Sequence, residues 1–348
     1  MFMNVNTPSV LLIYTGGTIG MIENPETGAL QNFDWDTLKR YVPELRRFKT
    51  YIDSLSLKAP IDSSDMQPQY WIDITHIIAD NYDKYDGFVL LHGTDTMAYT
   101  ASALSYMLEN LGKPVIITGS QLPIGKLRTD GKENLLTSIE IASARDENGQ
   151  PLVTEVCIFF ENQLLRGNRT TKINAEGFNA FRSYNFPALA KAGVHIKYED
   201  RLIRKPAADA VLCPHFKLNN HLVILTLFPG IRRDVVEAIC NIEGLRAVVL
   251  KTFGSGNAPQ HEWLLDAFKK LTDKGIIVVN ITQCSTGSVE MQRYETGIQL
   301  LQAGLLNGYD ATIEASVTKL MYLLGQDYDN DTIIKYMNTS IAGEITVD

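Results

Sequence analysis

The chain has 348 residues, of which 45% are hydrophobic and 21% are charged, as in globular proteins with a sizeable core. Its length predicts two domains or one large domain, and its formal net charge of -8 argues against an electrostatic surface for nucleic acid or anionic membrane. The start of the chain has neither a basic segment nor a long apolar run, which argues against a secretory signal or a membrane span. We therefore expect a cytoplasmic protein without nucleic-acid or membrane partners.

Short apolar runs alternate with helical patterns over the first half of the chain, as in a parallel α/β sheet. The expected strands cover residues 10–14, 86–92, 113–120 and 156–160. Between the second and third strands, apolar residues recur at helical spacing, and Gly112 is expected to cap that helix. The apolar stripe consists of Met97, Ala101, Leu104, Leu108 and Leu111.

The periodic pattern weakens after Phe186 and resumes near residue 222. We expect a larger N-terminal catalytic α/β domain over residues 1–190, an interdomain linker over 191–220, and a smaller C-terminal, Rossmann-like α/β domain over 221–348. The expected strands of the smaller domain are residues 222–227, 245–251 and 276–282. Its expected helices are residues 234–240, 263–271, 314–325 and 331–338, the last with Asp331 as N-cap.

Cysteine spacing and an acidic run both argue against a metal. The cysteines form no C-x-x-C pair, which favours reduced thiols, mostly in the core, over a disulfide framework or a zinc site. Residues 326–331 imitate half of a calcium loop, but Thr332 stands where that loop needs glycine. We therefore expect no metal site at these residues. The cysteines are Cys157, Cys213, Cys240 and Cys284.

Four polar segments remain as candidates for chemistry, since TGGTIG is neither a P-loop nor a complete dinucleotide-binding fingerprint. They are Thr18 in TGGTIG, the run 62–65, Thr94 with Asp95 in HGTDTM, and Lys172 in RGNRTTK. Each has a structural alternative. Thr94 and Asp95 suit a helix start, the acidic run suits a turn, and Lys172 suits a solvated surface.

The same side chains also suit acyl transfer. A threonine hydroxyl becomes a good nucleophile only when a base takes its proton, and a lysine held neutral by burial and neighbouring groups can be that base. The Asp95 carboxylate has an alternative role, which is to bind the ammonium group of an amino-acid substrate. Helix-start N–H groups near Thr94 can hold a developing oxyanion.

The glycines of TGGTIG predict a tight turn after a buried strand. Gly16 and Gly17 would let Thr18 stand at the carboxyl end of that strand, facing the other candidates, while Thr15 is expected to be structural. His92, at the end of the next strand, is expected to pack rather than to act as a base.

Seven motifs, taken together, resemble those of bacterial L-asparaginases of the cytoplasmic type I class. The pairing of TGGTIG with HGTDTM is the most specific part of this resemblance, which runs from residue 14 to about residue 290. The motifs are YTGGTIGM, DSSDM, HGTDTMAYTASAL, LRTDGKENL, RGNRTTK, GSGNAP and TQCSTG. The resemblance implies hydrolysis of L-asparagine to L-aspartate and ammonia by a threonine nucleophile, without a cofactor. It also implies intimate homodimers, often paired into homotetramers.

The resemblance assigns roles residue by residue. Thr18 matches the nucleophile, and Thr94, Asp95 and Lys172 match a second catalytic group that assists proton transfer and water activation. The residues implied in substrate binding are Asp62, Ser63, Ser64, Asp95 and Asn257, the last reaching the site from a neighbouring subunit.

Two features bear on how far the resemblance extends. Relatives commonly carry a tyrosine on the loop after the nucleophile, whereas Ala29 occupies that position here, so we do not expect a tyrosine lid. Some type I enzymes bind asparagine at a second, activating site, which would here include Thr171, Lys251 and Cys284. Lys251 replaces an arginine found in a relative and lacks its bidentate geometry for a carboxylate.

Three different functions stay compatible with these motifs. A glutaminase-asparaginase is one of them, because glutamine is longer than asparagine by a single methylene group, which is worth about 1–3 kcal/mol in a binding pocket. The asparaginase-like subunit of a tRNA-dependent amidotransferase shares the threonine motifs but is expected to carry an extra N-terminal domain before them. A non-catalytic amino-acid sensor would have no need of Thr18, Thr94, Asp95 and Lys172 together.

Overall fold

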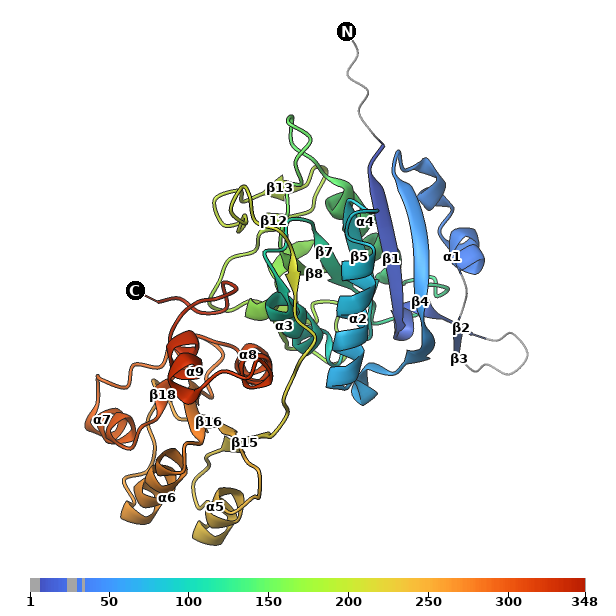
Figure 1. Cartoon of the computed structure of the whole chain (residues 1–348). Helices are drawn as coiled ribbons and strands as arrows, with labels where there is room; N and C mark the ends of the chain where they lie inside the picture. The colour runs from blue at the N-terminus through green and yellow to red at the C-terminus, as the bar shows by residue number, and fades with distance from the viewer. Residues whose placement is uncertain (1–6, 24–29, 33–34, 348) are drawn as a thin grey trace. The chain divides into compact units, whose positions relative to one another are not determined.

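The computed structural model describes residues 7–23, 30–32 and 35–347. The chain divides into two compact units, residues 1–216 and 217–348, which are coloured blue to yellow-green and yellow to red in Figure 1. Within the described residues, no helix combines the length and the apolar character needed to cross a bilayer.

Unit 1 is built on an eight-stranded sheet. Its strands are β1 (Ser9–Gly16), β4 (Tyr51–Ile61), β5 (Gly87–Leu91), β7 (Val115–Thr118), β8 (Val156–Phe160), β9 (Gln163–Arg166), β12 (Ala190–Lys191) and β13 (Lys197–Tyr198). The order across the sheet is β13-β12-β9-β8-β7-β5-β1-β4. Strands β4, β1, β5, β7 and β8 are parallel, whereas β9, β12 and β13 each pair antiparallel with their neighbours. The sheet is therefore mostly parallel, as predicted.

Both faces of this sheet are covered. The helices are α1 (Trp35–Tyr41), α2 (Pro68–Asp80), α3 (Met97–Met107) and α4 (Gly131–Ser143). Alternate residues of β1 point to opposite faces: Val10 and Leu12 pack with residues of α4 in one core cluster, and Leu11 and Ile13 pack with residues of α2 and α3 in a second. Burial on both faces explains why β1 reads as a continuous apolar run.

Short elements of unit 1 connect this framework. They are the ribbons β2 (Met21–Glu23) with β3 (Leu30–Asn32), β10 (Thr171–Lys172) with β11 (Phe181–Arg182), and β6 (Leu108–Glu109) with β14 (Cys213–Pro214). Single 3-10 turns cover Thr18–Gly20, Pro43–Arg47, Ser63–Asp65 and Gly167–Arg169. The turns at Thr18–Gly20 and Ser63–Asp65 contain predicted site residues.

Unit 2 is a smaller α/β unit. Its parallel sheet has the order β15 (Leu222–Thr226), β16 (Ala247–Thr252), β17 (Ile277–Thr282), β18 (Leu306–Asn307). The helices are α5 (Arg233–Cys240), α6 (Glu262–Asp273), α7 (Glu295–Gln302), α8 (Ile313–Gly325) and α9 (Asn330–Met337). Apolar residues of α5, α6 and α7 form one core with the sheet. The predicted fold class, two α/β parts of unequal size, is confirmed.

Several local expectations differ from the structure. Gly112 does not cap α3, because the helix ends at Met107 and residues 108–109 leave it to pair with β14. Asp331 is not the N-cap of α9: Asp329 is, and its carboxylate accepts the N–H of Thr332.

The predicted core position of the cysteines holds for half of them. Cys157 and Cys240 are buried, whereas Cys213 and Cys284 are exposed, and all four are free thiols.

Residues 191–216, expected in a linker, lie in compact unit 1 and contribute β13 and β14. Strands of only two residues leave little periodicity in a sequence, which is why this segment was predicted to be irregular.

Candidate active site

The predicted site residues of unit 1 follow strands that are neighbours in the sheet. Strands β4, β1, β5 and β7 are parallel and adjacent, so their carboxyl ends share one edge. The segments 62–64, 16–18, 93–95 and 119–121 follow these ends in that order. The chain leaves β1 toward β4 and then returns past β1 to β5, and such a switch point is where open α/β sheets bind ligands.

Glycines allow three of these segments to touch through their backbones. A Cβ on Gly17 would lie 2.4 Å from the backbone nitrogen of Gly93, and a Cβ on Gly16 would lie 2.1 Å from the carbonyl oxygen of Ile61. A Cβ on Gly93 would in turn meet Ser63 Oγ at 2.4 Å. Gly17 also has a φ of 88°, which L side chains rarely adopt. The turn that carries Thr18 is thus packed directly against the segment that carries Thr94.

Thr94, Asp95 and Lys172 come together although the lysine is far away in sequence. Lys172 Nζ donates to Thr94 Oγ1 at 2.8 Å and to Asp95 Oδ1 at 2.6 Å. The lysine side chain is 18% exposed and the aspartate side chain 60%. A cation held between a hydroxyl and a carboxylate can move protons at the hydroxyl, while the open carboxylate remains accessible to a ligand.

Gln121 is a member of this cluster that the sequence did not single out. Thr94 Oγ1 donates to its Oε1 at 3.3 Å, and its Nε2 donates to the carbonyl of Gly177 at 3.0 Å. The backbone nitrogen of Gln121 is bound by the Asp130 carboxylate at 3.0 Å. Its position directly after a predicted strand, like that of Thr94, was the available signal.

The run 62–65 combines a structural and an accessible part. Asp62 caps the 3-10 turn, because its Oδ1 accepts both the N–H and the hydroxyl of Ser64 at 2.9 Å, and the Ser64 N–H lowers the pKa of Asp62. Ser63 is 4% exposed. Its Oγ accepts the N–H of Asp95 at 3.3 Å and its carbonyl accepts the hydroxyl of Thr96 at 2.7 Å. Ser63 thus links this turn to the Thr94 segment, while Asp62 and Ser64 are exposed.

His92 lies beneath the site as a neutral, fully buried side chain. Trp71 Nε1 donates to Thr100 Oγ1 at 3.0 Å, and this hydroxyl lies 2.9 Å from His92 Nε2. A hydroxyl that accepts from tryptophan can donate to Nε2, so Nδ1 carries the proton and donates to the carbonyl of Gly93 at 2.7 Å. Burial lowers the pKa of His92 to about 4. His92 is a packing residue, as predicted, and does not serve as a base at neutral pH.

Tyr14 supports the turn that carries Thr18. Its hydroxyl donates to the carbonyl of Gly20 at 3.2 Å, and a Cβ on Gly20 would overlap the tyrosine ring. Burial raises the pKa of Tyr14 to about 12. Tyr14 therefore fixes the end of the 3-10 turn that begins at Thr18. Ala29, the position expected to lack a lid tyrosine, lies outside the described residues.

The remaining predicted residues lie in unit 2, apart from Thr171, which precedes Lys172 on β10. Asn257 closes a tight turn after β16, and its Oδ1 accepts the hydroxyl of Thr296 at 2.7 Å. Lys251 and Cys284 stand near the carboxyl ends of the neighbouring strands β16 and β17, where Gln283 Nε2 donates to the Lys251 carbonyl at 3.1 Å. That Thr171, Lys251 and Cys284 together form an activating site remains a prediction.

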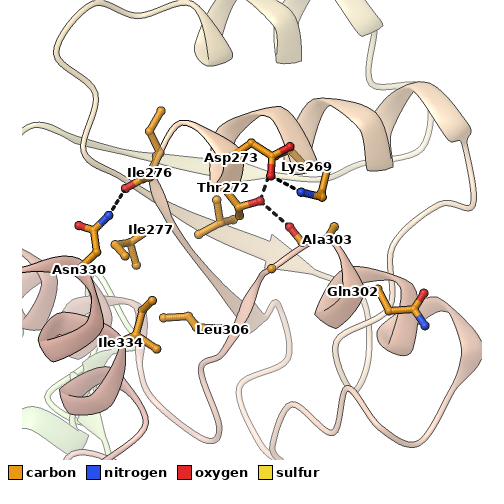
Figure 2. A pocket seen from close by; sticks show the side chains of 13 residues that line it. Lys269, Thr272, Asp273, Ile276, Ile277, Gln302, Ala303, Leu306, Asn330 and Ile334 are labelled. Atoms are coloured by element: carbon orange, nitrogen blue, oxygen red, sulfur yellow. Dashed lines mark hydrogen bonds and ion pairs between the residues drawn. The ribbon is translucent and has the colours of Figure 1, made fainter.

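Unit 2 also has a cavity of about 290 Å³ that contains none of the predicted residues. Figure 2 shows its apolar wall of Ile277, Leu306 and Ile334. The Thr272 hydroxyl donates to the Ala303 carbonyl at 2.6 Å, and Asn330 Nδ2 donates to the Gly275 carbonyl at 2.7 Å. These contacts hold the Thr272 hydroxyl and the Asn330 amide. Because none of the predicted site residues lines this cavity, the carboxyl edge of the unit 1 sheet remains the candidate active site.

Comparison with known families covers both units. Residues 9–204 match the family model "Asparaginase, N-terminal", and residues 221–337 match "Glutaminase/Asparaginase C-terminal domain". Both matched regions begin and end close to the limits of the described units.

Individual relatives match over nearly the whole chain. L-asparaginase 1 of Escherichia coli K12 is 46% identical, with 98% of each chain covered. The crystal structure of L-asparaginase I from Vibrio cholerae is 41% identical, with a TM-score of 0.87 over 98% of this chain and 99% of that one. One subunit of the glutamyl-tRNA(Gln) amidotransferase of Pyrococcus horikoshii is 33% identical over 97% of this chain and 77% of its own.

Proposed function

This chain belongs to the asparaginase family, and on that premise we propose that it hydrolyses L-asparagine to L-aspartate and ammonia with Thr18 as nucleophile. The observation that carries this proposal is the contact between Gly17 and Gly93. It brings the turn of Thr18 against the turn of Thr94, whose hydroxyl is held by Lys172.

We assign substrate binding to the exposed carboxylate of Asp95 and to the turn 62–64. Asp95 Oδ1 is held by Lys172, and the side chain remains 60% exposed, so it can accept the α-ammonium group of asparagine in a charge-assisted hydrogen bond. Ser63 and Ser64 are the matching candidates for the α-carboxylate. Because Ser63 Oγ already accepts the N–H of Asp95, its hydroxyl proton is available to donate to an anion.

In the proposed reaction, Thr18 Oγ attacks the side-chain amide carbon of asparagine. A C–O bond forms, the hydroxyl proton leaves with the amide nitrogen as the C–N bond breaks, and ammonia departs. Water then attacks the acyl carbon and restores Thr18. Thr94 and Lys172 serve the water step: the Thr94 hydroxyl, held by Lys172 through the 2.8 Å hydrogen bond, passes a proton of the attacking water to Thr18 Oγ as the ester C–O bond breaks. Direct attack of water on the amide, without an acyl-threonine, is the alternative that the same groups can catalyse.

We propose that the active form is a homodimer or homotetramer in which Asn257 reaches the site of a neighbouring subunit. Exposed apolar side chains support association. Ile224, on the edge strand β15, is 44% exposed, and Phe228, just after that strand, is 54% exposed. Apolar side chains on an exposed sheet edge are commonly covered by a second chain. Light scattering coupled to size exclusion measures the mass directly, and a monomer with full activity would contradict this arrangement.

The free state of all four cysteines supports the proposal of a cytoplasmic location. Cell fractionation with antibody detection tests it, and recovery of the protein with secreted or periplasmic markers would contradict it.

Glutamine is the competing substrate, because the C-terminal family model includes glutaminases. The decisive experiment measures ammonia release from L-asparagine and, separately, from L-glutamine, over micromolar to millimolar concentrations. We expect turnover of asparagine, and loss of most of it in Thr18→Ala and in Thr94→Ala without loss of the fold. Near-normal activity in either variant would refute the role of that threonine.

The same measurements distinguish an asparaginase from a sensor and from an amidotransferase subunit. Absence of turnover with both amides, together with a melting temperature that rises on addition of asparagine, would identify an amino-acid sensor. Preferred turnover of glutamine would favour a glutaminase or an amidotransferase subunit.

A further inference from the structure

We propose that Glu109, Cys213 and His215 form a binding site for one divalent transition-metal ion, for which Zn²⁺ is the best match. One ligand atom from each residue, a carboxylate oxygen, a thiol sulfur and an imidazole nitrogen, lies within 4.8 Å of the other two. The residues are far apart in sequence, with a separation of 106 positions between Glu109 and His215, so no spacing motif reveals them.

The ribbon of β6 and β14 places the three side chains on one face. Cys213 is directly opposite Glu109 in the antiparallel register. His215 follows Cys213 by two residues, and its N–H donates to the Met107 carbonyl at 2.8 Å, which continues the same register. Residues two apart on a strand point to the same face, and opposite residues share that face as well. Backbone pairing alone thus gathers the three ligands.

The ligand atoms are close to the separations that a metal requires. His215 Nε2 and Glu109 Oε2 are 2.8 Å apart and hydrogen bonded. Bond lengths of about 2.0–2.3 Å in tetrahedral geometry put nitrogen, oxygen and sulfur ligand atoms about 3.3–3.6 Å apart. Small rotations of these side chains, of which Glu109 is 54% and His215 is 18% exposed, would open the hydrogen bond and bring the sulfur closer.

The ribbon is held at both sides. Leu108 is 2% exposed and anchors the strand next to Glu109 in the core. Phe216 follows His215 and stacks on the ring of His76 from α2, with centroids 4.0 Å apart and an interplanar angle of 7°. A ribbon fixed in this way loses little conformational freedom when its side chains bind an ion.

The chemistry of the donors selects the ion. Thiolate and imidazole favour zinc and related transition metals over Mg²⁺ and Ca²⁺, which prefer oxygen ligands. Binding displaces the Cys213 thiol proton to solvent and uses neutral His215 and the Glu109 carboxylate, which leaves a fourth position for water. The site is open to solvent, since Glu109 and Cys213 are exposed.

This site is separate from the candidate active site. Helix α3 begins after Thr94 and Asp95 at the carboxyl edge of the sheet and ends at the opposite edge, where β6 follows it. The metal would therefore fasten the last segment of unit 1 to the end of α3 without touching the substrate. We expect chelation to lower thermal stability and to leave asparagine turnover at saturation unchanged.

Titration of the full-length, tag-free, metal-stripped protein with Co²⁺ tests the proposal. A cobalt–thiolate charge-transfer band and the visible bands of a tetrahedral ion should grow to one equivalent per chain, and Zn²⁺ should abolish them. Cys213→Ser should remove the charge-transfer band, and His215→Ala should weaken binding at least tenfold. The controls are Cys284→Ser, which removes another exposed cysteine, and His221→Ala, which removes an exposed histidine outside the site.

Two outcomes would overturn the proposal. One is the absence of a thiolate band in the wild-type protein, which would leave Glu109 and His215 as a simple ion pair. The other is a band that persists in Cys213→Ser or disappears in Cys284→Ser. Because Glu109 and Cys213 are exposed and His215 is half-buried, the variants should melt close to the metal-free wild type. The melting temperature of the wild type, but not of Cys213→Ser, should rise with Zn²⁺.

Discussion

Lys172 Nζ donates to both Thr94 Oγ1, at 2.8 Å, and Asp95 Oδ1, at 2.6 Å. One ammonium group therefore holds the hydroxyl proposed to relay protons and the carboxylate proposed to bind substrate. This double contact distinguishes Lys172 from a solvated surface lysine and is the basis of its proposed role in turnover.

Replacement of this lysine should separate the two roles. We expect Lys172→Met to lower kcat by about 10²- to 10⁴-fold, the range typical for loss of a proton-transfer group. Asp95→Asn should act mainly on KM, because it removes the charge that attracts the substrate ammonium group. Steady-state kinetics measures both, with Lys269→Met, a change in an exposed ion pair of unit 2, as the control. A kcat within twofold of wild type in Lys172→Met would contradict a role of the lysine in proton transfer.

The close approach of Gly17 to Gly93 should be intolerant of any side chain. We expect Gly17→Ala to abolish most turnover and to destabilise unit 1 by about 1–3 kcal/mol or more, because the new Cβ would lie 2.4 Å from the backbone nitrogen of Gly93. Gly149→Ala is the matched control, since Gly149 also has a positive φ, 77°, but nothing lies within 4 Å of its added Cβ. Calorimetry and turnover should distinguish the two, and similar behaviour of both variants would argue against the packing role.

Stability should decrease with acid because His92 is buried without charge. Its pKa is lowered to about 4 in the folded chain against about 6.5 when unfolded. Between these values the unfolded state binds one proton more than the folded state, so the free energy of unfolding falls as the pH falls from about 6.5 to about 4. This single group should remove about 2 kcal/mol between pH 7.5 and pH 5.

Urea unfolding of wild type and His92→Asn at the two pH values isolates this contribution from that of the other titrating groups. The difference in free energy between pH 7.5 and pH 5 should be smaller in the variant. Equal pH dependence in the two proteins would mean that His92 is not held neutral.

A buried ion pair should fasten the C-terminal segment of unit 2. Lys319 and Glu344 are 2% and 1% exposed, with Nζ and Oε1 2.5 Å apart, and burial lowers the pKa of Lys319. Glu344 also accepts the N–H groups of Ile341 and Ala342. Lys319→Met would leave a buried carboxylate unpaired and should cost about 3–5 kcal/mol.

The double variant Lys319→Met with Glu344→Gln tests the cause of that loss. Because it removes both charges, it should recover part of the stability, measured by urea unfolding monitored separately for each transition. A double variant that is less stable than Lys319→Met alone would contradict the explanation by an unpaired charge.

A second, activating site for asparagine remains a prediction that kinetics can decide. Binding at Thr171, Lys251 and Cys284 would make the rate rise sigmoidally with asparagine concentration. Lys251→Arg should strengthen this effect, since arginine binds a carboxylate in bidentate geometry. A hyperbolic curve over the whole range, recorded on a homogeneous oligomer, would exclude activation.

Sequence alone determined the strands that are buried on both faces. Residues 10–14, 86–92, 113–120 and 156–160 overlap β1, β5, β7 and β8, because a strand covered by helices on both sides must be apolar throughout. The edge strand β4 has a different character: all of its residues are exposed or only partly buried, so its sequence YIDSLSLKAPI lacks that signal. The end of α3 was likewise missed, because Leu108 and Leu111 are buried in a ribbon and a turn as well as they would be in a helix.

Sequence also determined which residues were candidates for chemistry, because the residue type alone supplies the hydroxyl, ammonium or carboxylate group of threonine, lysine and aspartate in these motifs. Only the tertiary structure decided which of them meet. The antiparallel return of β9 and the short ribbon of β10 and β11 bring Lys172 to Thr94 across 78 residues. Gln121 joined the cluster, and Glu109, Cys213 and His215 formed another, for the same reason. Sheet order and ribbon register set these contacts, and they depend on pairing between distant segments, which no local pattern of residues encodes.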